Sequence, residues 1–265
     1  MNKNKIDEFV KNVVTLGESL SGHLTKREMV FIATLPFLKK EGAILEIGSF
    51  KGKSTIVLSK SAEKVSAKKQ IHACDTFELS QETDPDGDPL ILFDTFKQNL
   101  QKHHVLEQVT IHKMSSQKLA ENWKLPLKVL WIDGDHSYQG AKQDFDNFKK
   151  FLSPGSIICF HDTLHKFDGP IRVFTEDVLL SPEFSCCGLT GSIAWALYNG
   201  DKPLSKNIWL KKINLAKKLQ SLSILILKHT KGIPYSNIVY KIKRSLIPHD
   251  TICPSKWLST IEKVT

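Results

Sequence analysis

The chain has 265 residues, of which 41% are hydrophobic and 25% charged, a balance typical of a soluble globular protein with one full core. It contains no apolar run long enough for a transmembrane helix. The formal net charge of +9 is unevenly placed, because residues 1–201 carry 24 Lys and Arg against 26 Asp and Glu, whereas residues 202–265 carry 13 against 2.

The N-terminus and the cysteines indicate the compartment. Residues 1–8 lack the apolar core of a secretory signal. The five cysteines are odd in number and match no zinc-binding spacing, and Cys74 and Cys159 fall in apolar runs where a free thiol packs as a small hydrophobe. We therefore expect a cytoplasmic protein.

The predicted elements alternate along the chain. Amphipathic helices are expected at 4–20 and 25–40, before a long series of strands and helices. The strands are expected at 43–48, 70–75, 108–113, 127–133 and 155–161, the helices between them near 53–65, 90–103, 116–122 and 138–151, and two closing strands at 183–189 and 192–199. This alternation predicts an α/β fold with a doubly wound, mostly parallel sheet. We divide the chain into N-terminal helices (1–40), an α/β domain (41–200) and a basic C-terminal helical extension (201–265).

The turn after the first strand is suited to a nucleotide-like ligand. Gly48 and Gly52 flank the turn, and a helix follows from Lys53. Glycines let the backbone approach a ligand, and a helix start offers free N–H groups. Glu46 places a carboxylate at the strand tip, where it can meet a cationic or hydroxyl-bearing group. The dinucleotide pattern Gly-x-Gly-x-x-Gly is not met, and a glycine turn in some other α/β protein is the alternative.

The second strand ends in Asp75, 23 residues after Gly52. In open α/β sheets, an acid at this position can accept both ribose hydroxyls of an adenosine. Residues 78–89 follow as an acidic, turn-rich segment. Its acids do not form a calcium-binding loop, because the flanking helices and the closing Glu are missing. We expect this segment to be a mobile lid over the site.

Polar side chains also follow the fourth and fifth strands. Asp133, Asp135 and His136 come after the fourth strand, and His161 and Asp162 after the fifth. The carboxyl ends of parallel strands meet at one edge of the sheet, where ligands bind. Carboxylates and imidazoles together suit a divalent cation, and the alternative is that these tips only cap helices.

The basic charge belongs to the C-terminal extension. Residues 202–265 have a net charge of +11, and two segments, 210–227 and 235–247, mix lysines with Leu and Ile. Such segments can contact an anionic membrane surface. The alternative is that they pack against their own domain or a second subunit of a homo-oligomer. No aromatic residues are spaced for base stacking, so no nucleic-acid partner is expected.

With these motifs, the chain resembles class I S-adenosylmethionine (SAM)-dependent methyltransferases. It is most similar to the bacterial group of macrocin-type sugar O-methyltransferases and cephalosporin-hydroxylase-like proteins (methyltransferase family 24 type). The resemblance covers roughly residues 25–200 and rests on five motifs: residues 46–55, the run Asp-Gly-Asp-His-Ser-Tyr at 133–138 with Asp144, residues 152–155, 160–162 and 191–195. It implies a Rossmann-like seven-stranded sheet whose last strand is antiparallel.

The resemblance also implies residue roles. His136 would be the catalytic base, with Asp135 as a second catalytic candidate. A divalent cation such as Mg²⁺ would bind Asp133, His161 and Asp162. The metal-dependent relatives have an acid where this chain has His161, and imidazole suits metals other than Mg²⁺ better. The residues implied to bind SAM are Glu46, Gly48, Ser49, Gly52, Ser54, Asp75, Ser115 and Asp133.

The expected function is SAM-dependent O-methylation of a hydroxyl group on a sugar, small-molecule or glycan acceptor. Two alternatives are a catalytically degenerate protein that binds SAM, and another nucleotide-binding α/β enzyme. The basic extension adds the expectation that the cytoplasmic protein is peripheral to a membrane.

Overall fold

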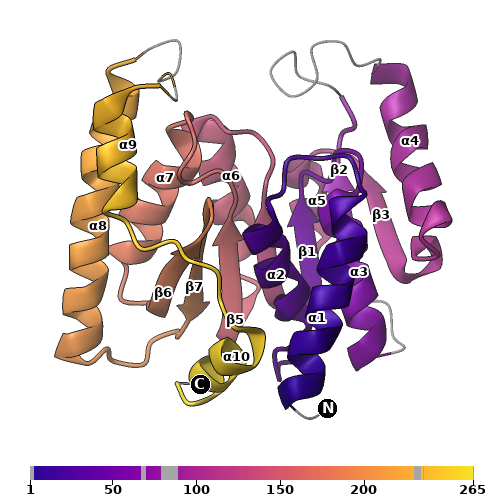
Figure 1. Cartoon of the computed structure of the whole chain (residues 1–265), viewed down its shortest axis with the longest axis horizontal. Helices are drawn as coiled ribbons and strands as arrows, with labels where there is room; N and C mark the ends of the chain where they lie inside the picture. Colours follow the sequence, from indigo (N-terminus) through magenta and orange to yellow (C-terminus); the bar gives the residue numbers. More distant parts are fainter. Residues whose placement is uncertain (1–2, 67–69, 79–88, 230–233, 235, 265) are drawn as a thin grey trace.

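A computed structural model of the chain describes residues 3–66, 70–78, 89–229, 234 and 236–264. Its centre is a seven-stranded sheet with strand order β3-β2-β1-β4-β5-β7-β6 (Figure 1). The strands are β1 (Ala43–Ile47), β2 (Ile71–Asp75), β3 (Val109–Lys113), β4 (Leu127–Ile132), β5 (Leu152–Phe160), β6 (Phe184–Thr190) and β7 (Ile193–Tyr198). The first five strands are parallel, and β7 is antiparallel to both β5 and β6. The predicted α/β class and mostly parallel sheet are confirmed.

Helices cover both faces of the sheet and enclose two apolar cores. One face packs against α1 (Lys3–Glu18), α2 (Lys26–Thr34), α3 (Lys53–Val65), α4 (Pro89–Lys102) and α10 (Pro254–Glu262). The other packs against α5 (Ser116–Asn122), α6 (Tyr138–Lys149), α7 (Gly169–Val173), a π-helical turn (Phe174–Leu179), α8 (Lys206–Leu227) and α9 (Ile238–Ser245).

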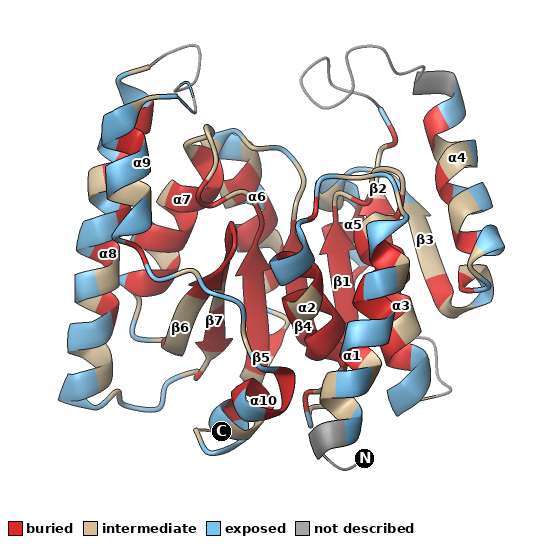
Figure 2. Cartoon of the chain, viewed as in Figure 1, coloured by how far each residue is buried: buried red, intermediate tan, exposed pale blue. Residues whose placement is uncertain are grey.

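Strand periodicity explains the two cores. Ile44 and Val129 join the core on one face, whereas their neighbours Leu45 and Leu130 join the other. Successive side chains on a strand point to opposite faces, so a strand covered on both sides is apolar throughout. Figure 2 shows the central strands buried along their length. The short apolar runs in the sequence therefore correspond to strands buried on both faces.

The C-terminal extension returns to the body of the protein. After α9 the chain crosses to the other face, where α10 packs against the N-terminal helices (Figure 1). The Trp257 ring makes edge contacts with Phe31 and Trp195. The carboxylate of Asp7 accepts hydrogen bonds from Ser255 N–H and Oγ at 2.9 and 2.7 Å. The N- and C-terminal segments thus stabilise each other.

Three expectations about elements need comment. The helix expected at 25–40 ends at Thr34, because Pro36 continues as a 3₁₀ turn (Leu35–Phe37). Strand β5 begins at Leu152, before the expected start at 155. Most of the expected lid, residues 79–88, lies outside the described residues. Among the helices the structure describes, none is both long and apolar enough to cross a membrane.

Candidate functional site

The first part of the site is the glycine turn between β1 and α3. Gly48 has a φ of 86°, and a Cβ atom added there would overlap the backbone carbonyl oxygen of Asp133 beyond β4. Gly52 has a φ of 90° and forms the N-cap of α3, where a Cβ atom would lie 2.9 Å from the side chain of Leu100. Both positions require glycine, because the backbone is left-handed and a neighbouring element occupies the space.

Asp75, the last residue of β2, holds this turn from the side. Its Oδ2 accepts hydrogen bonds from the backbone N–H groups of Ser49 and Phe50, both at 2.8 Å. Its Oδ1 accepts from the N–H of Phe77 at 2.7 Å. A carboxylate offers about four acceptor positions, so the predicted ribose contact stays compatible with these bonds. The structure adds a second task for Asp75, which is to fix the backbone of the turn.

Glu46 lies beneath the turn rather than at an open strand tip. Its side chain is buried and accepts hydrogen bonds from the hydroxyls of Ser49, at 3.1 Å, and Thr55. Burial raises the pKa of Glu46 to about 7, although hydrogen bonds from Ser54, Thr55 and Ser49 oppose the rise. Its Oε1 is buried and has no hydrogen-bond partner among the described residues. The hydroxyl-bearing groups that Glu46 meets in the structure are thus the protein's own Ser49 and Thr55, and its predicted contact with the cofactor stays a prediction.

The serines implied to bind the cofactor have local partners. The Ser49 and Ser54 side chains are buried, and the Ser49 hydroxyl donates to Glu46. Ser115 is the N-cap of α5, and its Oγ accepts from the N–H of Lys118 at 3.3 Å. Backbone groups of these residues can still face a ligand, so their predicted role stays a prediction. Their hydroxyl groups, however, stabilise the turn and the start of a helix.

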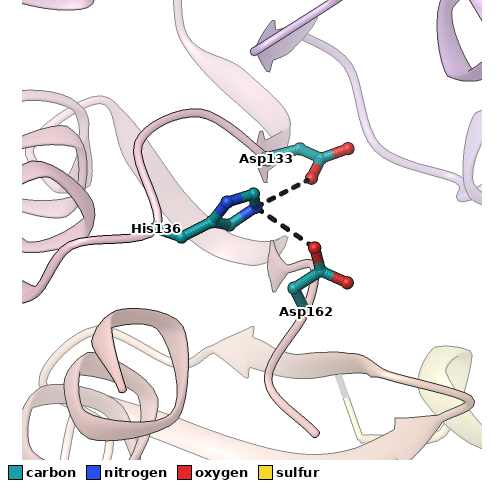
Figure 3. Close-up of side chains that lie close together, drawn as sticks. All are labelled: Asp133, His136 and Asp162. Atoms are coloured by element: carbon teal, nitrogen blue, oxygen red, sulfur yellow. Dashed lines mark ion pairs between the residues drawn. The ribbon is translucent and has the colours of Figure 1, made fainter. Parts of the chain in front are cut away.

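The second part of the site is a cluster of Asp133, His136 and Asp162 (Figure 3). Asp133 follows β4, His136 lies in the loop before α6, and Asp162 follows β5 with a φ of 53°. The His136 Nε2 atom lies 3.2 Å from Asp162 Oδ2 and 4.0 Å from Asp133 Oδ1. One ligand atom from each residue falls within 4.8 Å of the other two. Three of the predicted site residues thus meet at the carboxyl edge of the sheet.

The imidazole of His136 is held by an aromatic ring as well as by the acids. It stacks on Phe167 with a centroid distance of 4.5 Å and an interplanar angle of 4°. Burial alone would lower the pKa of His136, but the contact with Asp162 and the charges of Asp162 and Asp133 raise it above its ordinary value. The ring therefore has a fixed orientation and a stabilised protonated form.

His161 occupies a different position, behind the cluster. Its Nδ1 lies 2.9 Å from Asp133 Oδ1, and its Nε2 lies 3.8 Å from Glu28 Oε2. Burial would lower the pKa of His161, but Asp133, Asp162 and Glu28 raise it well above its ordinary value. This buried ring lies between two carboxylates, and its contact with Asp133 fixes the orientation of that side chain.

Glu28 is the site residue that the sequence did not predict. Burial would raise the pKa of Glu28, but contacts with His161 and hydrogen bonds from Thr25 and Ser192 lower it far below its usual range. Its Oε1 accepts from Ser192 N–H and Oγ at 2.6 and 2.7 Å, and its Oε2 from Thr25 N–H at 2.8 Å. In the sequence, Thr25-x-x-Glu28 is typical of a helix capping box, which the structure contains. That local signal gave no indication that Glu28 would also contact His161, which lies 133 residues further along the chain.

Two further candidates have contacts that bear on their predicted roles. His161 was predicted as a metal ligand, and its Nδ1 lies 2.9 Å from Asp133 Oδ1 and 3.6 Å from Asp162 Oδ1. The group of atoms close enough to share one ion, however, takes its nitrogen from His136. Asp135 was predicted to be catalytic, yet it is exposed and bonds Ser137, through the N–H at 2.8 Å and the hydroxyl at 2.9 Å. Since Ser137 is the N-cap of α6, Asp135 stabilises the turn that presents His136.

Comparison with known proteins adds the following. Residues 45–163 match a family model described as a methyltransferase domain. Similar solved structures include the O-methyltransferase NovP (14% identity, TM-score 0.54), which covers 75% of this chain and is itself covered to 100%. Cofactor-bound Rv0187 from MTB has 14% identity and a TM-score of 0.52, and the match covers 74% of this chain and 91% of that one. A putative O-methyltransferase from Klebsiella pneumoniae has 17% identity and a TM-score of 0.50, and the match covers 74% of this chain and 90% of that one. At these identities the likeness establishes the fold.

Proposed function

We propose that this chain uses SAM to methylate a hydroxyl group on a sugar or another small-molecule or glycan acceptor, because residues 45–163 match a methyltransferase-domain model and the sheet has the strand order of that fold. The observation that carries this proposal is the meeting of Asp133, His136 and Asp162 beside the glycine turn. Methyl transfer to a hydroxyl needs a cofactor cradle and a base at one edge of the sheet, and the chain offers both there.

The turn fits the SAM cofactor. Its glycine positions keep side chains off the backbone that would face the ligand. The buried, partnerless Oε1 of Glu46 leaves an acceptor beneath the turn, suited to an ammonium group reached directly or through water. Residues 48–52 and Asp75 would hold the cofactor, which supplies a methyl group on a sulfonium sulfur.

His136 is the residue that would take the acceptor proton. A sugar hydroxyl is a weak acid, so its proton must leave as the oxygen attacks the methyl carbon. Because Nε2 of His136 faces Asp162, we assign the N–H to Nε2 and the accepting lone pair to Nδ1. The imidazolium formed is then stabilised by Asp162 and Asp133. The proton thus moves from the acceptor oxygen to Nδ1.

This role is tested by comparing His136→Ala with His165→Ala, which removes another imidazole stacked on the same Phe167 ring. A general base contributes about 10²–10⁴-fold to the rate. We expect kcat to fall by that factor in His136→Ala alone, with the SAM dissociation constant within a few-fold of wild type in both. Wild-type kcat should rise with pH through a pKa above 6.5, since the nearby carboxylates raise the pKa of His136. Equal losses in the two variants would remove His136 from this role.

A divalent cation bound by the same cluster is the second candidate. The three ligand atoms of Asp133, His136 and Asp162 are close enough to converge on one ion, and carboxylates with one imidazole suit Mn²⁺, Fe²⁺ or Zn²⁺ better than Mg²⁺. Such an ion would lower the pKa of a bound hydroxyl. If Nε2 of His136 binds the ion, that nitrogen carries no proton and no longer forms an ion pair with Asp162. The base role and the ligand role therefore exclude each other.

Chelation distinguishes the general-base mechanism from the metal-assisted mechanism. In the metal-assisted case, EDTA should abolish activity, added Mn²⁺ or Mg²⁺ should restore it, and the wild type but not Asp162→Asn should retain the ion in elemental analysis. Full activity in EDTA, with no bound metal, would exclude the metal-assisted mechanism and leave His136 as a general base.

The acceptor class is addressed by screening sugar nucleotides, glycan fragments and macrolide glycosides. Calorimetric binding of SAM with no transfer to any hydroxyl would favour the alternative of a degenerate SAM-binding protein. Binding of NAD in place of SAM would favour another nucleotide-binding enzyme.

A further inference from the structure

Helix α9 carries its apolar residues on the outside. Its inner face is anchored by Tyr240, which is 1% exposed and donates a hydrogen bond to the carbonyl oxygen of Leu164 at 2.6 Å. The side chains of Ile238, Ile242 and Leu246 are 71%, 56% and 61% exposed. A surface helix normally turns its apolar face toward the core, so this arrangement is reversed.

Helix α8 also carries exposed apolar residues near its end. Within its last two turns Ile226 is buried, whereas Ile224 and Leu227 are 50% and 49% exposed. The two helices lie side by side (Figure 1). They are joined by a hydrogen bond from Lys218 Nζ to the carbonyl oxygen of Leu246, at 2.8 Å. The exposed residues of both helices therefore belong to one hairpin.

Basic side chains border the apolar face. With a rotation of about 100° per residue, Ile238, Val239, Ile242 and Leu246 fall within one arc of α9. Lys241, which is exposed, lies on one side of that arc, and Lys243, whose Nζ donates to Ser221 Oγ of α8, lies on the other. Residues 202–265 as a whole carry a net charge of +11, against −2 for residues 1–201. An exposed apolar strip between lysines is the composition of helices that lie in the interface of a membrane.

We propose that α9 and the last turns of α8 dock the protein on an anionic phospholipid surface. The apolar side chains would enter the boundary between headgroups and acyl chains, while the lysines contact lipid phosphates. A second copy of this chain fits the face less well, because pairing would bring two strongly basic extensions together. Charge complementarity thus favours acidic lipid headgroups.

The place of the hairpin gives docking a consequence for catalysis. The end of α8 and the start of α9 lie toward the same end of the molecule as the carboxyl ends of β1 and β2 (Figure 1). Docking there would bring the catalytic edge near the membrane, where a lipid-linked glycan could reach it. This consequence rests on the proposed function, whereas docking itself does not.

The test is co-sedimentation of the full-length protein with vesicles of phosphatidylcholine, alone or mixed with phosphatidylglycerol. We expect binding to the mixed vesicles at low salt and little binding to phosphatidylcholine alone. The double variant Ile238→Ser/Ile242→Ser should reduce the partition coefficient about tenfold or more. The matched control Ile91→Ser, which alters an equally exposed apolar residue on α4, should leave it unchanged.

Charge is tested by Lys241→Glu against Lys256→Glu, an equal change of net charge on α10. The first variant should weaken vesicle binding more than the second, by about five-fold for each charge removed from the surface. Failure of the wild type to bind mixed vesicles would overturn the proposal, as would equal losses in Ile91→Ser and the double variant. A dimer that Ile238→Ser/Ile242→Ser abolishes, without any vesicle binding, would assign the face to a second copy. Vesicle binding is measured without SAM or acceptor, so it can fail while methyl transfer succeeds, and the reverse.

Discussion

Replacing Asp75 tests how the protein prepares its cofactor site. In Asp75→Ala, the N–H groups of Ser49 and Phe50 each lose an acceptor at 2.8 Å. A hydrogen bond to a charged group contributes about 1.5–3 kcal/mol. If one such bond is needed to hold the turn in its binding conformation, SAM affinity should fall roughly 10- to 150-fold. Asp75→Asn keeps one acceptor oxygen without the charge and should lose less.

The assay is isothermal titration with SAM, after circular dichroism has shown that each variant is folded. Asp135→Ala is the matched control, because Asp135 holds the N–H and hydroxyl of Ser137 in the turn after β4 but does not touch the glycine turn. A direct ribose contact is measured separately with S-adenosylhomocysteine and its 2′-deoxy analogue. If Asp75 accepts that hydroxyl, the deoxy analogue loses affinity for wild type but not for Asp75→Ala. Unchanged SAM affinity in folded Asp75→Ala would refute both the ribose contact and the role of Asp75 in holding the glycine turn.

Three further predictions concern the supports of the site. Gly48→Ala should abolish SAM binding and destabilise the protein by several kcal/mol. Gly200→Ala is the control, because Gly200 is also at positive φ but a Cβ atom there would lie 3.2 Å from a side-chain atom, and it should bind SAM normally. Melting curves and calorimetry compare the two variants. Burial raises the pKa of Glu46 from 4.5 to about 7, so this carboxyl costs stability increasingly as pH rises through that range. Glu46→Gln should therefore gain about 2.5 kcal/mol of unfolding free energy relative to wild type between pH 5 and pH 8 in urea unfolding, and a pH-independent difference would contradict this. Glu28→Gln should lower the free energy of unfolding by roughly 3–5 kcal/mol, because it leaves the buried His161 ring and several hydrogen-bond donors without a carboxylate. Glu262→Gln, which breaks an exposed ion pair, should change it by less than about 1 kcal/mol, and similar losses in the two variants would show that the buried pair is not important.

Much of the fold was predictable because its signals are local. A strand buried on both faces must be apolar throughout, so residues 43–47 and 127–132 could be recognised without knowing their neighbours. Gly48 and Gly52 could be recognised because glycine adopts the left-handed backbone conformation of such a turn at little energetic cost, whereas other residues are strained there. The α10 helix was not predicted, since its apolar residues find their partners only in the distant N-terminal helices, against which it packs.

The choice of partners belongs to the tertiary structure. The sequence placed Asp133, His136, His161 and Asp162 at neighbouring strand ends, because the carboxyl ends of parallel strands share one edge. It could not decide which imidazole faces the carboxylates in the cluster. In the structure both do: His136 approaches Asp162 through Nε2, whereas His161 lies between Asp133 and the Glu28 carboxylate of α2.

The same division holds for the C-terminal extension. Its basic charge and mixed Lys and Leu/Ile composition are properties of the sequence. Which side of α9 faces the core depends on Tyr240 reaching the carbonyl of Leu164, a contact across 76 residues. That contact turns Ile242 outward, although helical periodicity alone would place an isoleucine inside. Local composition thus determines which segments are helices and strands, whereas long-range packing decides which of their faces and side chains remain available for binding.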